Sequence, residues 1–389
     1  MLIKKMVWIV TSDLYDGGTS VVSYNYYKMF KDNGFKARII TLNDLPISSK
    51  YSIPCDDIIN LNLLNSGKER KSKVWSVKGG IRLIFSFYKA ARLISRLEGN
   101  IIFVHFIPIL IAQLLHFFKL RSSNCIYALH TNIFSYRNGL LGLKGVVFDL
   151  FIKALTLGDK IVFLTSDVSN KFKDRINDPK FKSKIYTIPN VFKSITLDES
   201  TLNDFSSGII YSGRLSDEKN VKFIVDVYYR YKELGGVYDL TIAGDGPCRK
   251  ELEKMVRCGL YSENITFLGQ VAEMSAIYSK GKILILASKN EGFGMVLLEA
   301  INFHLLILSS NCESGPASIF EPKTSIPLNT FYQNDLGILL PTPVDNVDDY
   351  ALALLKLEKE QTLSVEVVKD ALSHFQQGKI FPKWSKLLT

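Results

Sequence analysis

Short runs of β-branched and aromatic residues alternate with longer segments of helical period along the whole 389-residue chain. This alternation is typical of parallel sheets that carry helices on both faces and are wound by right-handed crossovers. Eleven such runs need two sheets. The sequence therefore predicts an α/β fold of two doubly wound, Rossmann-like domains, whose strand-to-helix loops face a cleft between the domains. We expect strands at 6–10, 37–42, 101–105, 125–129, 160–165, 184–188, 208–212, 238–244, 264–269, 282–287 and 305–310, and helices at 20–33, 81–97, 145–157, 221–234 and 348–375.

The alternation lapses into polar and turn-forming residues at 188–208, which predicts a domain boundary there. The charge changes sign at the same place: residues 1–190 carry 28 basic and 13 acidic side chains, and the remainder carries 20 and 25. A basic half suggests that this half meets an anionic partner. We expect an N-terminal domain at 1–190, a C-terminal domain at 191–370, and a last helix at 371–389 packed back on the first domain. Residues 321–335 read as a surface loop.

Composition excludes several classes of protein. Five cysteines without a C-x-x-C pair indicate neither a zinc site nor a disulfide framework and fit a reducing cytoplasm. The first apolar run, of roughly five residues, is too short for a signal peptide. The apolar tract 100–120 approaches the length of a membrane span, but Pro108 and two histidines interrupt it. We expect a buried strand followed by a helix from Pro108, with a span as the alternative.

Two strand-to-helix loops carry phosphate-binding features. In the first, Gly17 and Gly18 precede Thr19 and Ser20, which can cap the next helix while the glycines let a phosphate or sugar approach its amides. A plain turn is the alternative. No G-x-G-x-x-G fingerprint is present, so a nicotinamide or flavin site loses its usual support.

In the loop YSGRLSDEKN, two cations stand five positions apart. Arg214 and Lys219 follow a strand, where they suit a pyrophosphate: Arg binds it through two hydrogen bonds and Lys acts as a point charge. The alternative is a surface pair balancing Asp217 and Glu218. A third loop, AGDGPC, adds glycines with good turn chemistry.

Two acids bracket the stretch EGFGMVLLE. If a helix begins near Gly294, then Gly294, Met295 and Val296 present free amides to an anion between Glu291 and Glu299. Eight residues at about 1.5 Å rise span on the order of 12 Å, comparable to the distance from sugar to ribose in a nucleotide diphosphosugar. Such acid pairs also occur by chance on ordinary helices.

Together these residues resemble the retaining family 4 glycosyltransferases of GT-B fold. The resemblance implies transfer of a hexose or N-acetylhexosamine from a nucleotide diphosphosugar, more often a UDP-sugar in this family. It implies that Arg214 and Lys219 stabilise the departing diphosphate, that Glu291 contacts the sugar and that Glu299 binds the ribose. The motifs that match in order are GGTSVV, LHTN, IPNVF, YSGRLSDEKN, AGDGPCRKELE, NITFLGQV, ASKNEGFGMVLLEA and SGPASIF.

The same resemblance assigns residues of the N-terminal half. It places His130, in LHTN, near the donor sugar, and adds Asn190 of IPNVF to Gly17 and Gly18 as expected donor-binding residues. Without the resemblance, His130 reads equally well as a strand-end histidine satisfied by the backbone. His105 keeps that structural interpretation.

The chain also departs from the family's pattern. Asn311 stands near a position where an acid is common, and 321–335 is an insertion. No Asp-x-Asp pair occurs, which predicts a metal-independent enzyme with no cofactor besides its donor substrate. Since no carboxylate is placed as a covalent nucleophile, the resemblance favours same-face attack with retention.

The segment 66–97 predicts the acceptor side. It combines five cations with Trp75 and a basic amphipathic helix, which suits an anionic membrane surface or the diphosphate of a lipid carrier. We expect a peripheral enzyme at the cytoplasmic face of the membrane that extends a polyprenyl-diphosphate-linked glycan in O-antigen, lipopolysaccharide or capsule synthesis. A solvated charge run is the alternative for the segment.

Three other functions compete with this one. A GT-B nucleotide-sugar epimerase would share the fold without needing a basic acceptor surface. A non-catalytic subunit of a glycosylation complex would tolerate loss of Glu291 or Lys219, but both are present. A nucleic-acid partner lacks any recognised motif or aromatic-basic repeat.

Overall fold

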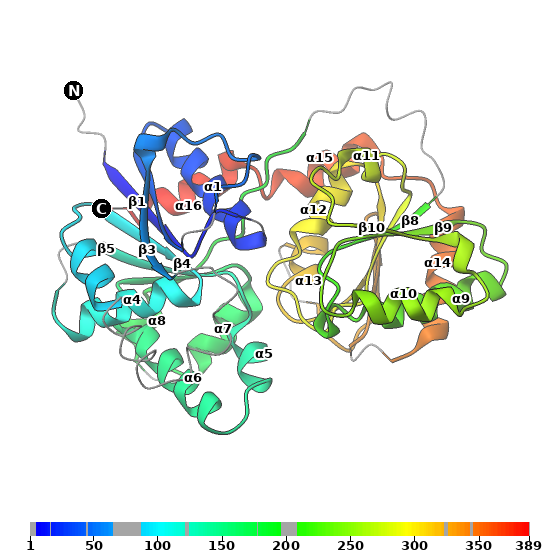
Figure 1. The fold of residues 1–389 in the computed structure, drawn as a ribbon, viewed down its shortest axis with the longest axis horizontal. Coiled ribbons are helices and arrows are strands. Elements are labelled where there is room, and N and C mark those ends of the chain that lie inside the picture. The colour runs from blue at the N-terminus through cyan, green and yellow to red at the C-terminus, as the bar shows by residue number, and fades with distance from the viewer. Residues whose placement is uncertain are drawn as a thin grey trace. The chain divides into compact units, whose positions relative to one another are not determined.

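The computed structural model describes residues 5–15, 17–43, 46–64, 87–120, 124–176, 178–195, 208–322, 326–342 and 345–388. Contacts divide the chain into two compact units (Figure 1). The N-terminal unit comprises Met1–Val191 and Gln377–Thr389, and the C-terminal unit comprises Phe192–Gln376. The chain therefore returns to the first unit at Gln377, later than the expected 371.

The N-terminal unit is built on a seven-stranded sheet in the order β3-β2-β1-β4-β5-β6-β7. All neighbouring strands pair in parallel. Strand β4 is buried at every position, as expected of a strand that is covered on both faces. The strands are β1 (Met6–Thr11), β2 (Lys36–Asn43), β3 (Ile58–Leu64), β4 (Asn100–Val104), β5 (Asn124–Leu129), β6 (Lys160–Phe163) and β7 (Ile185–Thr187).

Two apolar cores lie on the two faces of this sheet. Because side chains alternate along a strand, Trp8 and Val10 of β1 enter one core while Val7 and Ile9 enter the other. The helices of this unit are α1 (Gly18–Asp32), α4 (Phe106–Phe117), α5 (Ile133–Asn138), α6 (Gly142–Ala154), α7 (Ser166–Asp174), α8 (Pro179–Lys182) and α16 (Gln377–Ser385).

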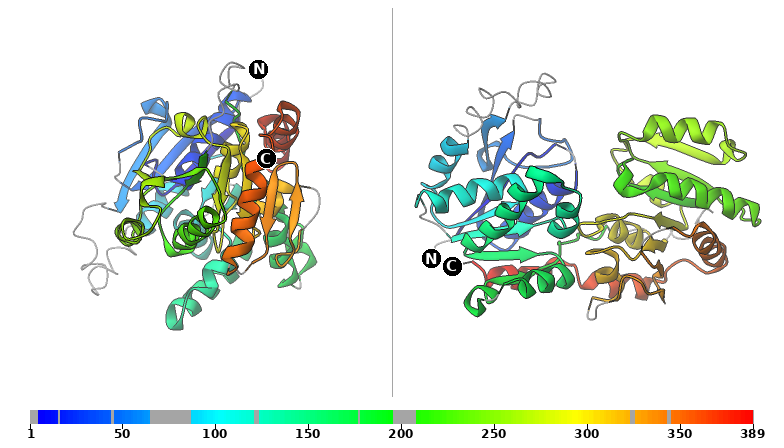
Figure 2. Two further views of the ribbon diagram at one scale, coloured as in Figure 1. Left: turned by 90° about the vertical axis from the view of Figure 1, so that its right-hand side faces the viewer. Right: turned by 90° about the horizontal axis from the view of Figure 1, so that it is seen from below.

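The C-terminal helix α16 packs in the N-terminal unit beside α1 (Figures 1 and 2). Trp384 is fully buried and meets the rings of Tyr26 and Phe30 edge-on at 4.9 and 6.1 Å. The carbonyl of Leu387 accepts hydrogen bonds from Asn124 and Lys160 at 3.0 and 2.5 Å. The last segment thus completes a core formed mainly by residues near the start of the chain.

The C-terminal unit repeats the plan with a second seven-stranded sheet, in the order β10-β9-β8-β11-β12-β14-β13. Among the described strand pairs of this sheet, only the edge strand β13 runs antiparallel to its neighbour, β14. The two doubly wound parallel sheets predicted from the alternation are confirmed. The strands are β8 (Gly208–Ser212), β9 (Asp239–Ala243), β10 (Ile265–Gly269), β11 (Ile283–Leu286), β12 (Leu306–Ser310), β13 (Tyr332–Asn334) and β14 (Gly337–Leu340).

The expected helix 348–375 is two helices. Leu363, between them, is buried, and its backbone N–H and C=O bond the carbonyl and the ring of His304 at 3.0 and 2.6 Å. Ser364 then caps the second helix by accepting a hydrogen bond from the Val367 N–H. The helices of this unit are α9 (Val221–Glu233), α10 (Arg249–Arg257), α11 (Ser275–Tyr278), α12 (Met295–Asn302), α13 (Pro316–Phe320), α14 (Val347–Lys359) and α15 (Val365–Ser373).

The structure differs from the sequence-based expectation at three strands. The runs that form β3 and β14 are not among the expected strands, and the end of the 321–335 insertion is the edge strand β13 and not only a loop. Asn311, the atypical residue, is buried and donates to the Pro327 carbonyl at 2.7 Å, which ties the insertion to the sheet.

The apolar tract 100–120 forms strand β4 and helix α4, with Pro108 buried in the first turn of the helix. Among the described residues, no helix is long and apolar enough to cross a bilayer. Of the basic segment 66–97, only 87–97 is described, and helix 87–94 is all that the structure gives of the expected helix 81–97. The cations expected at the acceptor side lie outside the described residues.

Candidate functional site in the C-terminal unit

The strand order of the second sheet reverses between β8 and β11, and ligands bind such sheets where the order reverses, beyond the carboxyl ends of the strands. The loop after β8 contains Arg214 and leads into the short helix η4 (Asp217–Lys219). The loop after β11 contains Ser288 and Glu291 and leads into α12. Topology therefore brings together two motifs that are about seventy residues apart, as the 72-residue separation of Asn290 from Glu218 illustrates.

Glycines let the loops of the second sheet approach each other closely. Gly213 and Gly244 both have positive φ, and a Cβ on Gly244 would lie 1.8 Å from the Gly213 carbonyl oxygen. A Cβ on Gly246 would lie 2.2 Å from the carbonyl oxygen of Leu215. The glycines of AGDGPC are thus required by packing of backbone against backbone.

Lys219 and Glu291 form an ion pair at the centre of this site. The Lys219 Nζ lies 2.7 Å from Glu291 Oε1, which also accepts a hydrogen bond from the Ser288 hydroxyl at 2.7 Å. Ser314 donates to the Glu291 carbonyl at 2.6 Å, and Ser310 donates to the Ser288 carbonyl at 2.7 Å. Because Glu291 is buried, these contacts hold its carboxylate in one position.

Helix α12 begins where the acid pair predicted it. Gly294 is the N-cap residue in the left-handed conformation, with φ 87°, and no side chain caps the helix. The first N–H groups of a helix have no partner within the helix, so the amides around Met295 and Val296 can meet an anion. The backbone at Gly315 packs against the residue before Gly294: a Cβ on Gly315 would lie 2.8 Å from the Phe293 carbonyl oxygen.

Glu299 lies inside α12 and accepts a hydrogen bond from the Tyr278 hydroxyl at 3.0 Å. Burial and the nearby Glu299 raise the pKa of Tyr278 well above its usual value, so Tyr278 remains a donor. Since Glu291 precedes the helix, the helical rise applies only from Met295 to Glu299. The span of about 12 Å, which applies that rise to the whole interval, is therefore too simple.

Arg214 is exposed and makes no ion pair with a carboxylate in the described part of the chain. Its backbone carbonyl accepts a hydrogen bond from the buried Tyr211 at 3.0 Å, which positions the loop. Arg214 therefore does not form the alternative surface pair with Asp217 and Glu218. Glu218 instead bonds the other loop, through its carbonyl to the Lys289 N–H at 2.9 Å.

Sequence reasoning missed several residues around Glu291. Ser288 stands three positions before Glu291 in an S-x-x-E pattern that could have drawn attention to it. Cys312 is buried near the ion pair, and burial, with the charge of Glu291, raises the pKa of its thiol to about 12. Tyr278 had no signal, because it is 21 residues from its partner Glu299.

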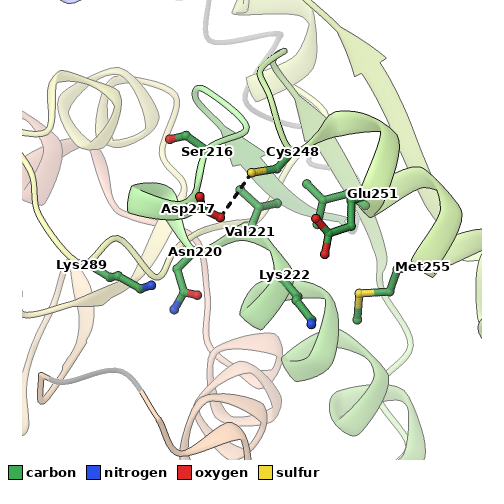
Figure 3. A pocket seen from close by; sticks show the side chains of 10 residues that line it. Ser216, Asp217, Asn220, Val221, Lys222, Cys248, Glu251, Met255 and Lys289 are labelled. Atoms are coloured by element: carbon green, nitrogen blue, oxygen red, sulfur yellow. Dashed lines mark hydrogen bonds between the residues drawn. The ribbon is translucent and has the colours of Figure 1, made fainter.

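A hollow of about 190 Å³ opens on the outer side of the turn that carries Lys219 (Figure 3). The side chains of Asp217, Cys248 and Lys222 line it, and the Cys248 thiol lies 3.5 Å from an Asp217 oxygen. Neither Lys219 nor Glu291 is among its lining residues, so this hollow is distinct from the ion pair. Across the described ranges, no group of three or more His, Cys, Asp or Glu could hold a metal ion.

In the N-terminal unit, Gly17 is the N-cap of α1 and has a φ of 125°. Gly18 is the first helical residue, so Thr19 and Ser20 lie within the first turn and do not cap the helix as expected. Ser20 instead donates to Asp13 Oδ1 at 3.2 Å, and the Tyr15 N–H lies 3.3 Å from the same oxygen. The chain thus puts its own carboxylate at the start of α1.

His130 follows β5 in the same unit and lies beside Asn190. Burial, with a smaller contribution from His105, lowers the pKa of His130 to about 3, so its ring is neutral near pH 7. His130 Nε2 lies 3.5 Å from the Tyr26 hydroxyl, and a hydrogen bond with the Asn190 side chain raises the pKa of His130 against the larger effect of burial.

His105 ends β4 with a φ of 72°, and its Nε2 lies 3.0 Å from the Thr131 hydroxyl. Burial lowers its pKa as well. This contact and the position before α4 fit the structural role expected of His105.

The family model described as "Glycosyl transferases group 1" matches residues 197–373. The chain is 30% identical to the GalNAc-alpha-(1->4)-GalNAc-alpha-(1->3)-diNAcBac-PP-undecaprenol alpha-1,4-N-acetyl-D-galactosaminyltransferase of Campylobacter jejuni, over 46% of this chain and 47% of that protein. It is 25% identical to the amylovoran biosynthesis glycosyltransferase AmsD of Erwinia amylovora, over 72% of this chain and 78% of that protein.

Solved structures of glycosyltransferases share the fold over nearly the full chain. The lipopolysaccharide outer core galactosyltransferase WaaB matches with a TM-score of 0.66, at 17% identity and 98% coverage of both chains. The pneumococcal O-GlcNAc transferase GtfA, solved with UDP and GlcNAc, matches with a TM-score of 0.72, at 15% identity and 98% coverage of both chains. Residues 197–373 are therefore a group 1 glycosyltransferase domain, and the chain has the GT-B fold.

Proposed function

We propose that this glycosyltransferase moves a hexose or N-acetylhexosamine from a UDP-sugar to a polyprenyl-diphosphate-linked glycan, with retention and without a metal ion. The observation that carries the proposal is the ion pair of Lys219 and Glu291 beside the uncapped start of α12. A lysine and free helix amides neutralise a departing diphosphate, and a fixed carboxylate orients sugar hydroxyls. The similar GtfA structure was solved with UDP and GlcNAc, which supports the donor class.

Each site residue then has a role in the proposal. Arg214 and Lys219 bind the diphosphate together with the amides of Gly294, Met295 and Val296. In addition, Glu291 binds the sugar and Glu299 the ribose. Four residues of the N-terminal unit also bind the donor: Gly17, Gly18, His130 and Asn190. Neutral His130 can exchange hydrogen bonds with a sugar hydroxyl but does not supply a positive charge.

The reaction breaks the bond between the anomeric carbon and the β-phosphate oxygen and forms a bond to an acceptor hydroxyl on the same face of the sugar. The acceptor proton passes to the leaving β-phosphate. Lys219 holds the charge that develops on this phosphate, which is the step where electrostatic stabilisation contributes most. Glu291 positions the sugar and forms no bond to the anomeric carbon.

The acceptor is proposed from the relatives' chemistry. The similar Campylobacter enzyme is named for an undecaprenol-diphosphate glycan, and AmsD for amylovoran biosynthesis. An acceptor on a lipid carrier requires the enzyme to work at a membrane, and we propose the cytoplasmic face. The basic character of the first half of the chain agrees with such a partner.

A thermal-shift panel of UDP, GDP and their sugars, followed by transfer with the stabilising donor, tests this function. We expect stabilisation by one UDP-sugar and transfer to a polyprenyl-diphosphate oligosaccharide, with the α-anomeric configuration of the donor retained by NMR. Activity that survives chelation with EDTA is expected. Release of a free epimerised sugar without transfer would contradict the proposal, as would near-normal turnover of Glu291→Gln.

A further inference from the structure

Helix α6 of the N-terminal unit is apolar on both faces, but only one face is buried. The rings of Phe148 and Phe151 pack on Phe106 at 5.3 and 5.5 Å. The Gln113 side chain donates to the Phe151 carbonyl at 3.1 Å. This inner face is sufficient to fix the helix to the unit, so the apolar residues on the outer face need another explanation.

The outer face carries a row of aliphatic side chains that we call the α6 stripe: Leu141, Leu143, Val146, Val147 and Leu150. Four of them stand at positions i, i+3, i+4 and i+7 of the helix, which places them on one side. Leu141, Leu143 and Leu150 are 85%, 78% and 62% exposed. Single exposed apolar residues are ordinary, but a contiguous row marks a contact surface. In Figure 1, α6 lies beside α5 at the margin of the unit.

Positive charge borders this row. Lys144 and Lys153 are exposed on the same helix. Its one acid, Asp149, is held by Arg137 through hydrogen bonds of 2.7 and 2.8 Å, and this contact lowers the pKa of Asp149. The nearby Arg175 acts on Asp149 in the same direction. The surface therefore combines aliphatic residues and cations, while its acid is already neutralised.

We propose that the α6 stripe docks the enzyme on an anionic lipid bilayer. The aliphatic side chains enter the boundary between headgroups and acyl chains, and the lysines meet lipid phosphates. Protein interfaces are enriched in aromatic anchors and depleted in lysine, whereas this row is wholly aliphatic and both cations of α6 are lysines. The inference rests on the proposed function for one point, that the acceptor resides in a membrane.

Flotation with vesicles of phosphatidylcholine and phosphatidylglycerol tests the surface. The variant Leu143→Glu/Leu150→Glu should bind roughly tenfold more weakly or worse, because two inserted side chains become charged. Leu260→Glu/Leu352→Glu is the matched control: it makes the same charge change at two exposed leucines of the C-terminal unit and should float like the unaltered protein. Leu143→Ala/Leu150→Ala adds no charge and should still bind less, which a purely electrostatic contact would not predict.

Failure of the unaltered protein to float would overturn the proposal. So would equal flotation of the stripe variant and the control. If the unaltered protein instead forms dimers that Leu143→Glu/Leu150→Glu separates, the stripe is a contact between copies and the bilayer assignment is wrong. The proposed function is tested separately on the same proteins, by UDP-sugar binding and by transfer to a lipid-free acceptor. Vesicle binding without transfer would contradict the proposed function but not the docking surface.

Discussion

Helices α1 and α12, one in each unit, both have an N-cap glycine with positive φ, yet the two helix ends differ in chemistry. At α1, after Gly17, the carboxylate of Asp13 lies against Ser20 and the Tyr15 N–H. At α12, after Gly294, the nearby Glu291 is paired with Lys219. The first helix end is already supplied with an internal anion, whereas the second combines open amides with a cation. Shared architecture therefore does not imply a shared role.

The ionisable groups differ in the same way. The N-terminal unit holds His130 as a neutral ring, and the C-terminal unit holds a charged pair at its centre. From this we infer that charge stabilisation in the reaction comes from the C-terminal unit. The N-terminal unit contributes hydrogen bonds and surfaces.

The largest effect should come from removing the cation. Lys219→Ala leaves the buried Glu291 without its partner and the diphosphate without a charge, so transfer should fall by roughly 10²–10³-fold. Initial rates with the preferred donor measure this. Lys222→Ala, one turn further on and exposed, is the control and should keep its rate. An undiminished rate for Lys219→Ala would place the charge stabilisation elsewhere.

The next largest effect should come from removing the contact of α16 with the rest of the N-terminal unit. Trp384→Ala should lower the free energy of unfolding of that unit by about 3–5 kcal/mol, because a fully buried ring is lost between Tyr26 and Phe30. Hydrogen exchange of β1 and α1 peptides should accelerate, with peptides of the C-terminal sheet unaffected. Lys386→Ala, exposed nearby, serves as the reference. Equal acceleration in both units would contradict the assignment of α16 to one of them.

Two glycines with similar φ allow the steric cost of an added Cβ to be distinguished from the cost of a positive φ. Gly244 and Gly17 have φ of 142° and 125°, but only at Gly244 would an added Cβ meet a backbone oxygen within 4 Å, at a distance of 1.8 Å. Gly244→Ala should therefore destabilise its unit by about 3 kcal/mol or more, and Gly17→Ala by about 1 kcal/mol. Denaturant unfolding compares the two. Similar losses would mean that conformation alone explains both glycines.

Near neutral pH, the smallest expected effect is a pH dependence confined to the N-terminal unit, which grows on acidification. The folded pKa of His130, about 3, lies below its ordinary value, so the unfolded chain binds more protons between about pH 6.5 and 3. Stability is fully present above that window and falls on acidification, by up to about 1.4 kcal/mol per pH unit. His130→Gln should flatten the dependence, while His374→Gln in the other unit should not. Parallel pH curves for His130→Gln and the unaltered chain would show that the ring is already protonated.

Local sequence determined a large part of the fold. Continuous apolar runs such as the one in β4 predicted buried parallel strands, since neighbouring residues are sufficient to set that pattern. The start of α12 was also predicted, because a glycine between two acids marks it locally. The short strands β13 and β14 were missed. Strand β14 joins the sheet by pairing with β12, which lies well before it in the chain, and β13 is a strand only because it pairs with β14.

In the candidate site, too, some residues were predicted from the sequence and others were seen only in the structure. Glu291, Lys219 and Glu299 were found from motif spacing, whereas their partners Ser288 and Tyr278 were not. A spacing identifies a residue type that suits a chemistry. It does not identify the side chain that will hold it, since that side chain arrives from another part of the fold.

By itself the sequence determined the alternation of strands and helices, the positions of the glycine turns and the residues that bear charge. Only the tertiary structure decided that Lys219 reaches Glu291, that Glu299 is held by Tyr278, and that His130 is neutral. It also decided which rings Trp384 of α16 meets and that the α6 stripe stays exposed. The reason is physical: secondary structure follows from neighbours along the chain, but burial, pairing and pKa depend on which distant groups the parallel sheets bring to the same edge.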